Sequence, residues 1–240
     1  MAGHSKWANI KHRKGKADAL KGKIFSRVTK EIISSVKQGG PDPKNNPRLK
    51  IALQKAKEAN LPNENIERNI KKASSSDQAD YSSMVYEFYG YNGVGILAEV
   101  LTDNKNRSAS EMRIATNKKG GTIATPGSVA YNFDRKGVTT VSSSQVKDED
   151  ALFLLVTELG AEDFEKHDDL YVITSSTEDL HAIKEAINAK EIKVDSSEFE
   201  YIPKTTIACE SEDQKSNEEL IDYLENLDDV DAVFHNMSQE

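Results

Sequence analysis

Two groups of side chains near the start of the chain have the types and spacing to bind phosphate. Residues 1–16 carry five Lys and Arg and no acidic residue, with a tryptophan and two histidines interleaved. Cations neutralise backbone phosphates, and planar rings stack on unpaired bases. We therefore predict that this arm contacts nucleic acid through His4, Lys6, Trp7, Lys11, Arg13, Lys14 and Lys16.

The second group is a line of lysines on a helix predicted over residues 17–38. These lysines recur every seven residues, at Lys16, Lys23, Lys30 and Lys37. A helix turns by about 100° per residue, so the four positions drift by only about 20° at each step and lie on one side. A helix with one cationic side can follow a phosphate backbone. The alternative is a solvated face, but such faces usually mix signs, and Glu31 is the only acidic residue between Asp18 and Asp42.

Further cations extend this predicted surface. Arg27 flanks the lysines, and Arg48 and Lys50 lie on the outer side of the next predicted helix. Residues 1–75 hold 18 Lys and Arg against 6 Asp and Glu, a net charge of +12, whereas the remainder holds 14 against 34, a net charge of −20. The basic part attracts polyanions, and the acidic part repels them and favours solubility. A basic surface that binds nothing in particular is the alternative.

Catalytic and cofactor chemistry is not indicated. Gly90, Gly93 and Gly95 have the wrong spacing for a dinucleotide fingerprint, and Cys209 lies beside acidic residues that oppose thiolate chemistry. The aspartates of residues 228–231 are a candidate for a divalent cation, but a solvated turn is the favoured interpretation. We predict no catalytic residues, no metal site, no cofactor and no small-molecule substrate.

Membrane and export features are also not indicated. The longest apolar run, residues 152–156, is far shorter than the roughly 18 apolar residues of a membrane span. The first seven residues lack the apolar core of a secretory signal, and the single cysteine cannot form an intrachain disulfide. These features predict a cytoplasmic protein with no membrane partner. They do not predict its oligomeric state.

Apolar spacing predicts three short helices in the basic part. The first has inward positions every four residues, at Leu20, Ile24, Val28, Ile32 and Val36, with Phe25 on the same face. Asn46 and Pro47 fit the cap and the first position of a second helix, and Asn63 fits the cap of a third. A serine-rich linker at residues 74–77 follows, so a helical bundle is expected.

After the linker the apolar period becomes that of strands. Two strands flank an Asn-Gly turn, and a helix and a strand follow, over residues 84–88, 96–101, 104–118 and 129–133. Residues 137–202 show the order βαββαβ, which is typical of a ferredoxin-like unit. The tail adds a strand, a helix and a strand, over residues 205–208, 216–227 and 231–235, which can complete the first sheet.

The predicted fold class is therefore α+β and multidomain. It comprises an N-terminal three-helix bundle, a second α+β domain, and a ferredoxin-like domain inserted in the second. The predicted boundaries are residues 1–76 for the basic helical domain, 77–135 plus 204–240 for the α+β domain, and 136–203 for the insertion.

Several long segments resemble the YebC/PmpR family, whose relatives include mitochondrial translational activators. They are MAGHSKWANIKHRKGKADALKGKIFSRVTKEI, GGPDPKNNPRLKIALQKAKEANLPNENIERNIKKA, YGYNGVGILAEVLTDNKNRSASEMR, GGTIATPGSVAYNF and LIDYLENLDDVDAVFHN. The resemblance covers essentially the whole chain and implies the same three domains. It also implies DNA-binding transcriptional regulation for some members and a role on translating ribosomes for others, without enzymatic activity.

Three functions follow as expectations. The leading one is a non-enzymatic transcriptional regulator that binds DNA through the basic N-terminal domain. The second is a translation factor that binds ribosomal RNA, with Trp7 or His4 stacked on unpaired bases. The third is an acidic protein-interaction module that uses the tail from Glu218 to Asp231.

Overall fold

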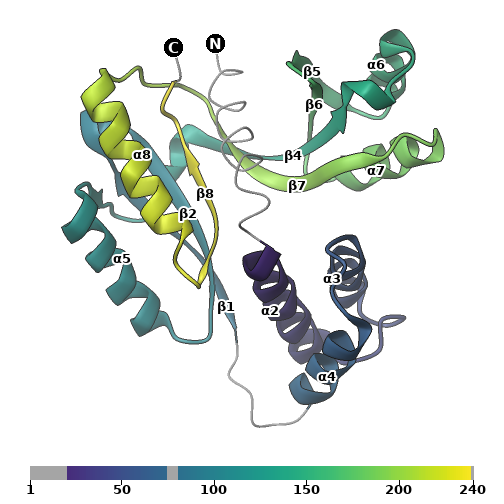
Figure 1. The fold of residues 1–240 in the computed structure, drawn as a ribbon, viewed down its shortest axis with the longest axis horizontal. Coiled ribbons are helices and arrows are strands. Elements are labelled where there is room, and N and C mark those ends of the chain that lie inside the picture. Colours follow the sequence, from purple (N-terminus) through teal and green to yellow (C-terminus); the bar gives the residue numbers. More distant parts are fainter. Residues whose placement is uncertain (1–20, 75–80, 239–240) are drawn as a thin grey trace. The chain divides into compact units, whose positions relative to one another are not determined.

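The structure is a computed structural model that describes residues 21–74 and 81–238, with side chains from residue 24 onward (Figure 1). The described residues form two compact units. One contains residues 21–74, 81–129 and 209–233, and the other contains residues 130–208 and 234–238. Two four-stranded sheets and the N-terminal helices confirm the predicted α+β fold class.

The first described elements are the three helices of the basic part: α2 (Lys21–Gly39), α3 (Pro47–Glu58) and α4 (Asn63–Ala73). Val28, Ile32 and Val36 are buried in their shared core, as predicted. Ile24 is wrongly predicted to be inward, because it is 40% exposed, whereas Ile33 is 4% exposed. The apolar face of α2 is therefore rotated from the four-residue spacing and is widest in the C-terminal half of the helix, where residues 32–36 are all buried.

Asn46 fixes the start of α3, as predicted. Its Oδ1 accepts a hydrogen bond from the Leu49 backbone N–H at 3.0 Å, and Pro47 occupies the first turn. Its Nδ2 also donates to the backbone carbonyls of Ser35 and Gly40, each at 2.8 Å. Asn46 therefore caps one helix and ties it to the end of another.

The predicted cap of α4 is wrong. Asn63 is the first residue of that helix, and Pro62 occupies the preceding position without a capping side chain. Proline fixes its own backbone near helical φ, so a helix can begin beside it without a side-chain acceptor.

The first sheet has the strand order β3-β1-β2-β8. Strands β1 (Ser82–Tyr89) and β2 (Gly95–Thr102) pair antiparallel from Ser82↔Thr102 to Tyr89↔Gly95. The predicted Asn-Gly turn joins them, with positive φ at Asn92 (54°) and Gly93 (75°). The other strands are β3 (Thr122–Ile123) and β8 (Val230–His235), and helices α5 (Lys105–Lys119) and α8 (Ser211–Glu225) pack against each other.

The second sheet has the strand order β5-β6-β4-β7. Its elements follow the chain as β4 (Phe133–Ser142), α6 (Glu149–Glu158), β5 (Ala161–His167), β6 (Leu170–Ser175), α7 (Leu180–Ala189) and β7 (Val194–Pro203). This is the antiparallel order of a ferredoxin-like fold, with Val156, Ile173 and Ile183 in its core. Because these elements lie between β3 and α8 in the chain, the unit is inserted in sequence within the elements of the first sheet.

Two predicted strands and one helix start differ from the structure. Residues 130–132 form a short 3₁₀ helix, and the backbone N–H of Val129 donates to the buried Glu87 carboxylate at 2.7 Å instead of to a strand. Residues 205–208 make one isolated bridge, Ile207↔Met237. Helix α8 begins at Ser211, five residues before the predicted start. The apolar spacing missed its first turn, because that turn is polar and acidic.

The predicted domain boundaries remain predictions. Strand β4 runs without a break from Phe133 to Ser142, so the boundary placed between residues 135 and 136 falls within it. In the described part of the chain, no helix combines the length and apolar character needed to cross a membrane.

Candidate nucleic-acid interface

Five of the thirteen predicted binding side chains are described: Arg27, Lys30, Lys37, Arg48 and Lys50. The other eight lie outside the described side chains: His4, Lys6, Trp7, Lys11, Arg13, Lys14, Lys16 and Lys23. Their roles stay predictions.

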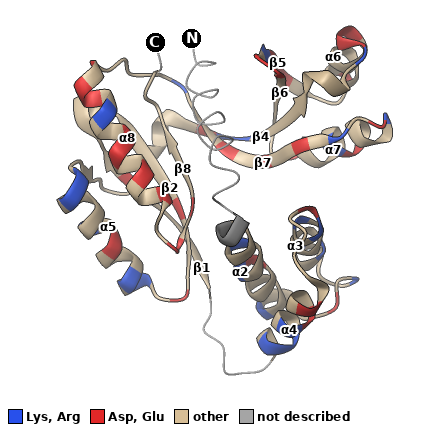
Figure 2. Cartoon of the chain, in the orientation of Figure 1, with Lys and Arg blue, Asp and Glu red and all other residues tan. Residues whose placement is uncertain are grey.

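The described helices carry a surplus of cations. Residues 21–74 hold 13 Lys and Arg against 5 Asp and Glu, a net charge of +8, whereas residues 81–238 hold 14 against 31, a net charge of −17. Figure 2 shows this contrast between the blue residues of α2 to α4 and the mostly red residues of α8. The charge division predicted from the sequence therefore coincides with separate structural elements.

Helix α3 presents cations to solvent. Arg48 and Lys50 are both exposed, and an Arg48 Nη donates to the side-chain oxygen of Gln38 at the end of α2. Lys37 lies on the last turn of α2 and is half-buried. Exposed cations that were not among the predicted contacts join them on these helices and their connection: Lys44, Lys57, Arg68, Lys71 and Lys72.

Arg27 is engaged with an acidic residue of its own helix. Its Nε lies 3.5 Å from Glu31, and Glu31 also accepts from Lys55 of α3 at 3.0 Å. The side chains of Arg27, Glu31 and Lys55 are 27%, 22% and 35% exposed. Glu31 therefore offsets part of the cationic charge on this side of the helices.

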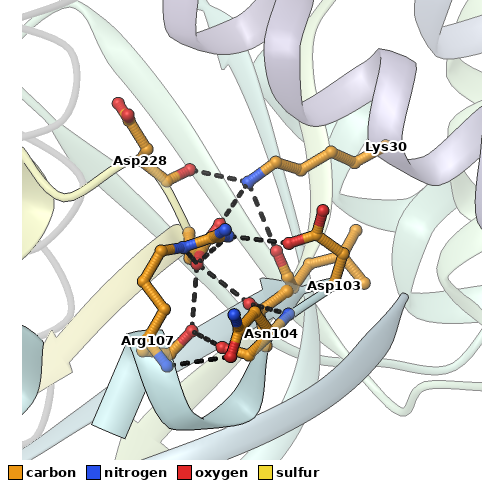
Figure 3. Close-up of polar contacts among 9 residues, drawn as sticks. Lys30, Asp103, Asn104, Arg107 and Asp228 are labelled. Carbon is orange, nitrogen blue, oxygen red and sulfur yellow. Dashed lines mark hydrogen bonds and ion pairs between the residues drawn. The ribbon is translucent and has the colours of Figure 1, made fainter. Parts of the chain in front are cut away.

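Lys30, at the middle of the lysine line, does not point into solvent. Its Nζ donates to the Asp229 carboxylate at 3.0 Å and to the backbone carbonyls of Asp228 and Leu101 at 2.8 and 3.3 Å (Figure 3). The Lys30 side chain is 12% exposed. A solvated stripe is therefore interrupted at its centre by a contact with residues far along the chain.

Asp229 is the acceptor at the centre of this cluster. Its Oδ2 accepts from Arg107 Nη2 at 2.7 Å, from Thr102 Oγ1 at 2.9 Å and from Ser108 Oγ at 2.9 Å, with Arg107 Nε at 3.2 Å. The Asp229 side chain is 3% exposed. Burial alone raises the pKa of Asp229, but hydrogen bonds from Arg107, Lys30, Thr102 and Ser108 outweigh it and lower the pKa to about 2.

The start of α5 positions these donors. Strand β2 ends at Thr102, and the Asn104 side chain caps α5 by accepting from the Arg107 backbone N–H at 3.0 Å. Asp103 accepts from Arg107 Nη2 at 2.8 Å and orients the guanidinium. Asn104, rather than the neighbouring Asp103, is therefore the N-cap of α5.

The expectation of a solvated turn at residues 228–231 is wrong at its centre. Asp228 is exposed, but Asp229 is buried and saturated with protein donors. Across residues 21–74 and 81–238, no group of three or more His, Cys, Asp or Glu is arranged to hold a metal ion. The sequence gives a weak signal for this cluster, because Asp229 meets its donors only after distant segments come together.

Tyr81 connects the helices to the first strand in another way. It packs against the hydrophobic core of α2, α3 and α4 and immediately precedes β1. Burial, followed by the nearby carboxylates of Asp103 and Asp229, raises the pKa of Tyr81. The helices and the Asp229 cluster are therefore neighbours at two points.

Cys209 is half-buried, and burial raises the pKa of its thiol. A raised thiol pKa disfavours the thiolate that nucleophilic chemistry requires. The described surroundings of Cys209 thus oppose thiolate chemistry, as its acidic neighbours in the sequence indicate.

Comparisons with known proteins agree along the chain. Residues 5–76 match the N-terminal domain of TACO1/YebC proteins, and residues 81–237 match the TACO1/YebC second and third domain. A probable transcriptional regulatory protein of Protochlamydia amoebophila is 62% identical over 237 residues, which are 99% of this chain and 96% of the relative. A protein of the same description from Chlamydia muridarum is 54% identical over 239 residues, 99% of this chain and all of the relative.

The crystal structure of a conserved hypothetical protein from Aquifex aeolicus has the same fold. It superposes with a TM-score of 0.85 at 37% identity and covers 98% of both chains. The resemblance predicted from the sequence motifs is confirmed, and the chain belongs to the TACO1/YebC family.

Proposed function

We propose that this protein is a non-enzymatic regulator of gene expression that binds DNA through the cationic surface of its N-terminal helical part. The observation that carries the proposal is the division of charge, +8 over residues 21–74 and −17 over residues 81–238. The relatives from Protochlamydia and Chlamydia, which are described as probable transcriptional regulatory proteins, support a regulatory role.

The physical basis is counterion release. Each phosphate that a Lys or Arg neutralises frees condensed cations, so binding weakens steeply as salt rises. Lys37, Arg48 and Lys50 are the described members of the predicted surface that are not part of the Glu31 or Asp229 clusters. Because phosphate contacts carry no base information, we expect weak sequence preference from these three side chains.

Ribosomal RNA is the alternative ligand for the same surface. The arm at residues 1–16 has cations and the aromatic ring of Trp7, which suit unpaired bases as well as phosphates. The two ligands are distinguished by preference: a transcriptional regulator binds duplex DNA at least as tightly as structured RNA and does not sediment with ribosomes.

The test uses fluorescence anisotropy with labelled duplex DNA and a structured RNA of equal length. The triple variant Lys37→Glu, Arg48→Glu and Lys50→Glu is compared with the wild-type chain over a salt series. A matched control reverses three exposed lysines of the acidic inserted unit, Lys147, Lys190 and Lys193. We expect at least a tenfold loss of affinity for the first variant, with a shallower salt dependence, and little loss for the control.

Two outcomes would change the proposal. Equal losses in both triple variants would show that the net charge, rather than the helical surface, determines binding. Co-sedimentation of the cellular protein with ribosomes, abolished by ribonuclease, together with tighter binding of the RNA, would replace DNA with ribosomal RNA as the ligand.

A further inference from the structure

Lys30 is placed both in the predicted phosphate-binding line and in an internal ion pair. It lies seven residues from Lys23 and from Lys37, on the same side of α2 by helical spacing. Its amine nevertheless lies 3.0 Å from Asp229, and its side chain is 12% exposed. A phosphate that approaches the middle of the line therefore meets a cation that already has a carboxylate partner.

The Asp229 cluster can release Lys30 without leaving a buried carboxylate unpaired. Lys30 donates to Oδ1, whereas Arg107, Thr102 and Ser108 all donate to Oδ2. Arg107 continues to neutralise Asp229 when Lys30 departs, and its own interaction with Asp103 holds it in place. The large cost of stranding a buried charge is therefore avoided.

The remaining contacts of the Lys30 amine are with neutral groups. The carbonyls of Leu101 and Asp228 accept from it, and water or phosphate oxygens can replace them. An ammonium group has three donors on a flexible stem, so it can turn from one anion to another without a change in the helix backbone.

We propose that Lys30 has two alternative anionic partners, the Asp229 carboxylate of its own chain and a backbone phosphate of bound nucleic acid, so that Asp229 limits the affinity of the helical surface. This inference rests on the proposed function, because it concerns the same surface. Asp229 acts as a positioning residue: it competes for Lys30 and does not contact the nucleic acid itself.

The test is a double-mutant cycle of Asp229→Asn and Lys30→Met, measured by DNA binding over a salt series. Asn keeps the size of Asp229 and an oxygen acceptor but removes the charge, and Met keeps the apolar stem of Lys30. We expect Asp229→Asn to bind about threefold to tenfold tighter than wild type and to steepen the log–log salt slope by about one phosphate contact. In the Lys30→Met background the same substitution is expected to have no effect.

Asp228→Asn is the matched control. It removes the same charge from the neighbouring residue, whose side chain is exposed. Lys30 donates to the backbone carbonyl of Asp228 and not to its carboxylate, so the substitution leaves that hydrogen bond in place. Equal affinity gains in Asp228→Asn and Asp229→Asn would overturn the inference, because the effect would then reflect net charge. A gain from Asp229→Asn that persists in the Lys30→Met background would overturn it as well.

A second measurement needs no variant and covers the case in which Asp229→Asn does not fold. Hydrogen–deuterium exchange of the wild-type chain is compared with and without duplex DNA. Release of Lys30 is expected to increase exchange in residues 101–108 and 228–231, and unchanged exchange there with DNA bound contradicts the inference. Failure of the wild-type chain to bind nucleic acid at any salt concentration would instead contradict the proposed function.

Discussion

The N-terminal helices and the inserted ferredoxin-like unit have similar aliphatic cores but net charges of opposite sign. Each buries a small aliphatic core, around Ile32 in the helices and around Ile183 in the insertion. Residues 21–74 carry a net charge of +8, whereas residues 133–203 hold 7 Lys and Arg against 17 Asp and Glu, a net charge of −10. Either sign of surface charge is compatible with such a core. The net charge of a region therefore indicates the kind of partner that it attracts and does not indicate its fold.

The largest expected effect concerns whether these two regions unfold separately. Ile32 and Ile183 are both fully buried, and truncation of either to Ala should lower the free energy of unfolding by about 2–5 kcal/mol. If the regions are independent folding units, Ile32→Ala shifts one calorimetric transition and Ile183→Ala shifts another. A single transition that both variants shift equally would remove the basis for treating them as separate domains.

The second prediction concerns acid sensitivity at Asp229. Its pKa is lowered from 3.8 to about 2 in the folded chain, so its charge stabilises the fold above about pH 4 and this stabilisation is lost as the pH falls toward 2. The expected contribution at neutral pH is about 2 kcal/mol. Urea unfolding of wild type and Asp229→Asn should show a difference near neutral pH that shrinks with acidification.

Other charged groups surround Asp229 in the folded chain. Lys30 and Arg107 both pair with its carboxylate, and Asp103 pairs with Arg107. Burial, followed by the charge of Asp229, raises the pKa of Glu111. Protonated Glu111 therefore stabilises the fold at low pH, and this stabilisation is lost as the pH rises, opposite to the pH dependence from Asp229. A stability difference between wild type and Asp229→Asn that is constant from neutral to strongly acid pH would contradict the prediction.

The third prediction concerns the junction of α2 and α3. Asn46→Ala removes the cap of α3 and two hydrogen bonds to the carbonyls of Ser35 and Gly40. We expect a loss of about 1–2 kcal/mol in stability, seen as an earlier urea midpoint for the helical transition. The exposed Asn45→Ala is the control, and an equal loss in both variants would show that the buried cap is unimportant.

The smallest expected effect concerns Glu31. Glu31→Gln removes a carboxylate that pairs with Arg27 and Lys55 in a partly exposed cluster, which should change stability by less than about 1 kcal/mol. The same substitution should strengthen DNA binding by about twofold to threefold, because it removes a negative charge that offsets cations of this surface. Weaker binding would show that Glu31 orients these cations productively.

Local chemistry explains which features could be predicted from the sequence. Asn46 with Pro47, the Asn92-Gly93 turn, and the alternating elements of residues 137–202 are set by interactions between near neighbours, and the structure confirms each of them. Family motifs added the domain order. The fold class therefore followed from short-range patterns and resemblance together.

Long-range packing explains what could not be predicted. The burial of Ile33 rather than Ile24 depends on where α3 and α4 meet α2, which helical spacing alone does not determine. Asp229 resembles its neighbour Asp228 in sequence, and only the approach of Lys30, Arg107 and Ser108 makes it a buried acceptor. Lys30 was predicted as a cation of the surface line, but its pairing with Asp229, 199 residues further along the chain, could not be predicted from the sequence.

The two ends of the inserted unit lie next to each other. Phe133 and Pro203 are register partners at the end of the β4–β7 pair, and the Lys204 backbone N–H donates to the Asn132 carbonyl at 2.7 Å. The Asn132 side chain also bonds Thr205, so entry and exit are fastened together. Once these strands pair, the segment of about 70 residues from Phe133 to Pro203 is already closed, and the entropic cost of closing it no longer opposes assembly of the first sheet. We therefore expect the inserted unit to fold before β8 joins its sheet, so that folding of the insertion promotes assembly of the domain that contains it.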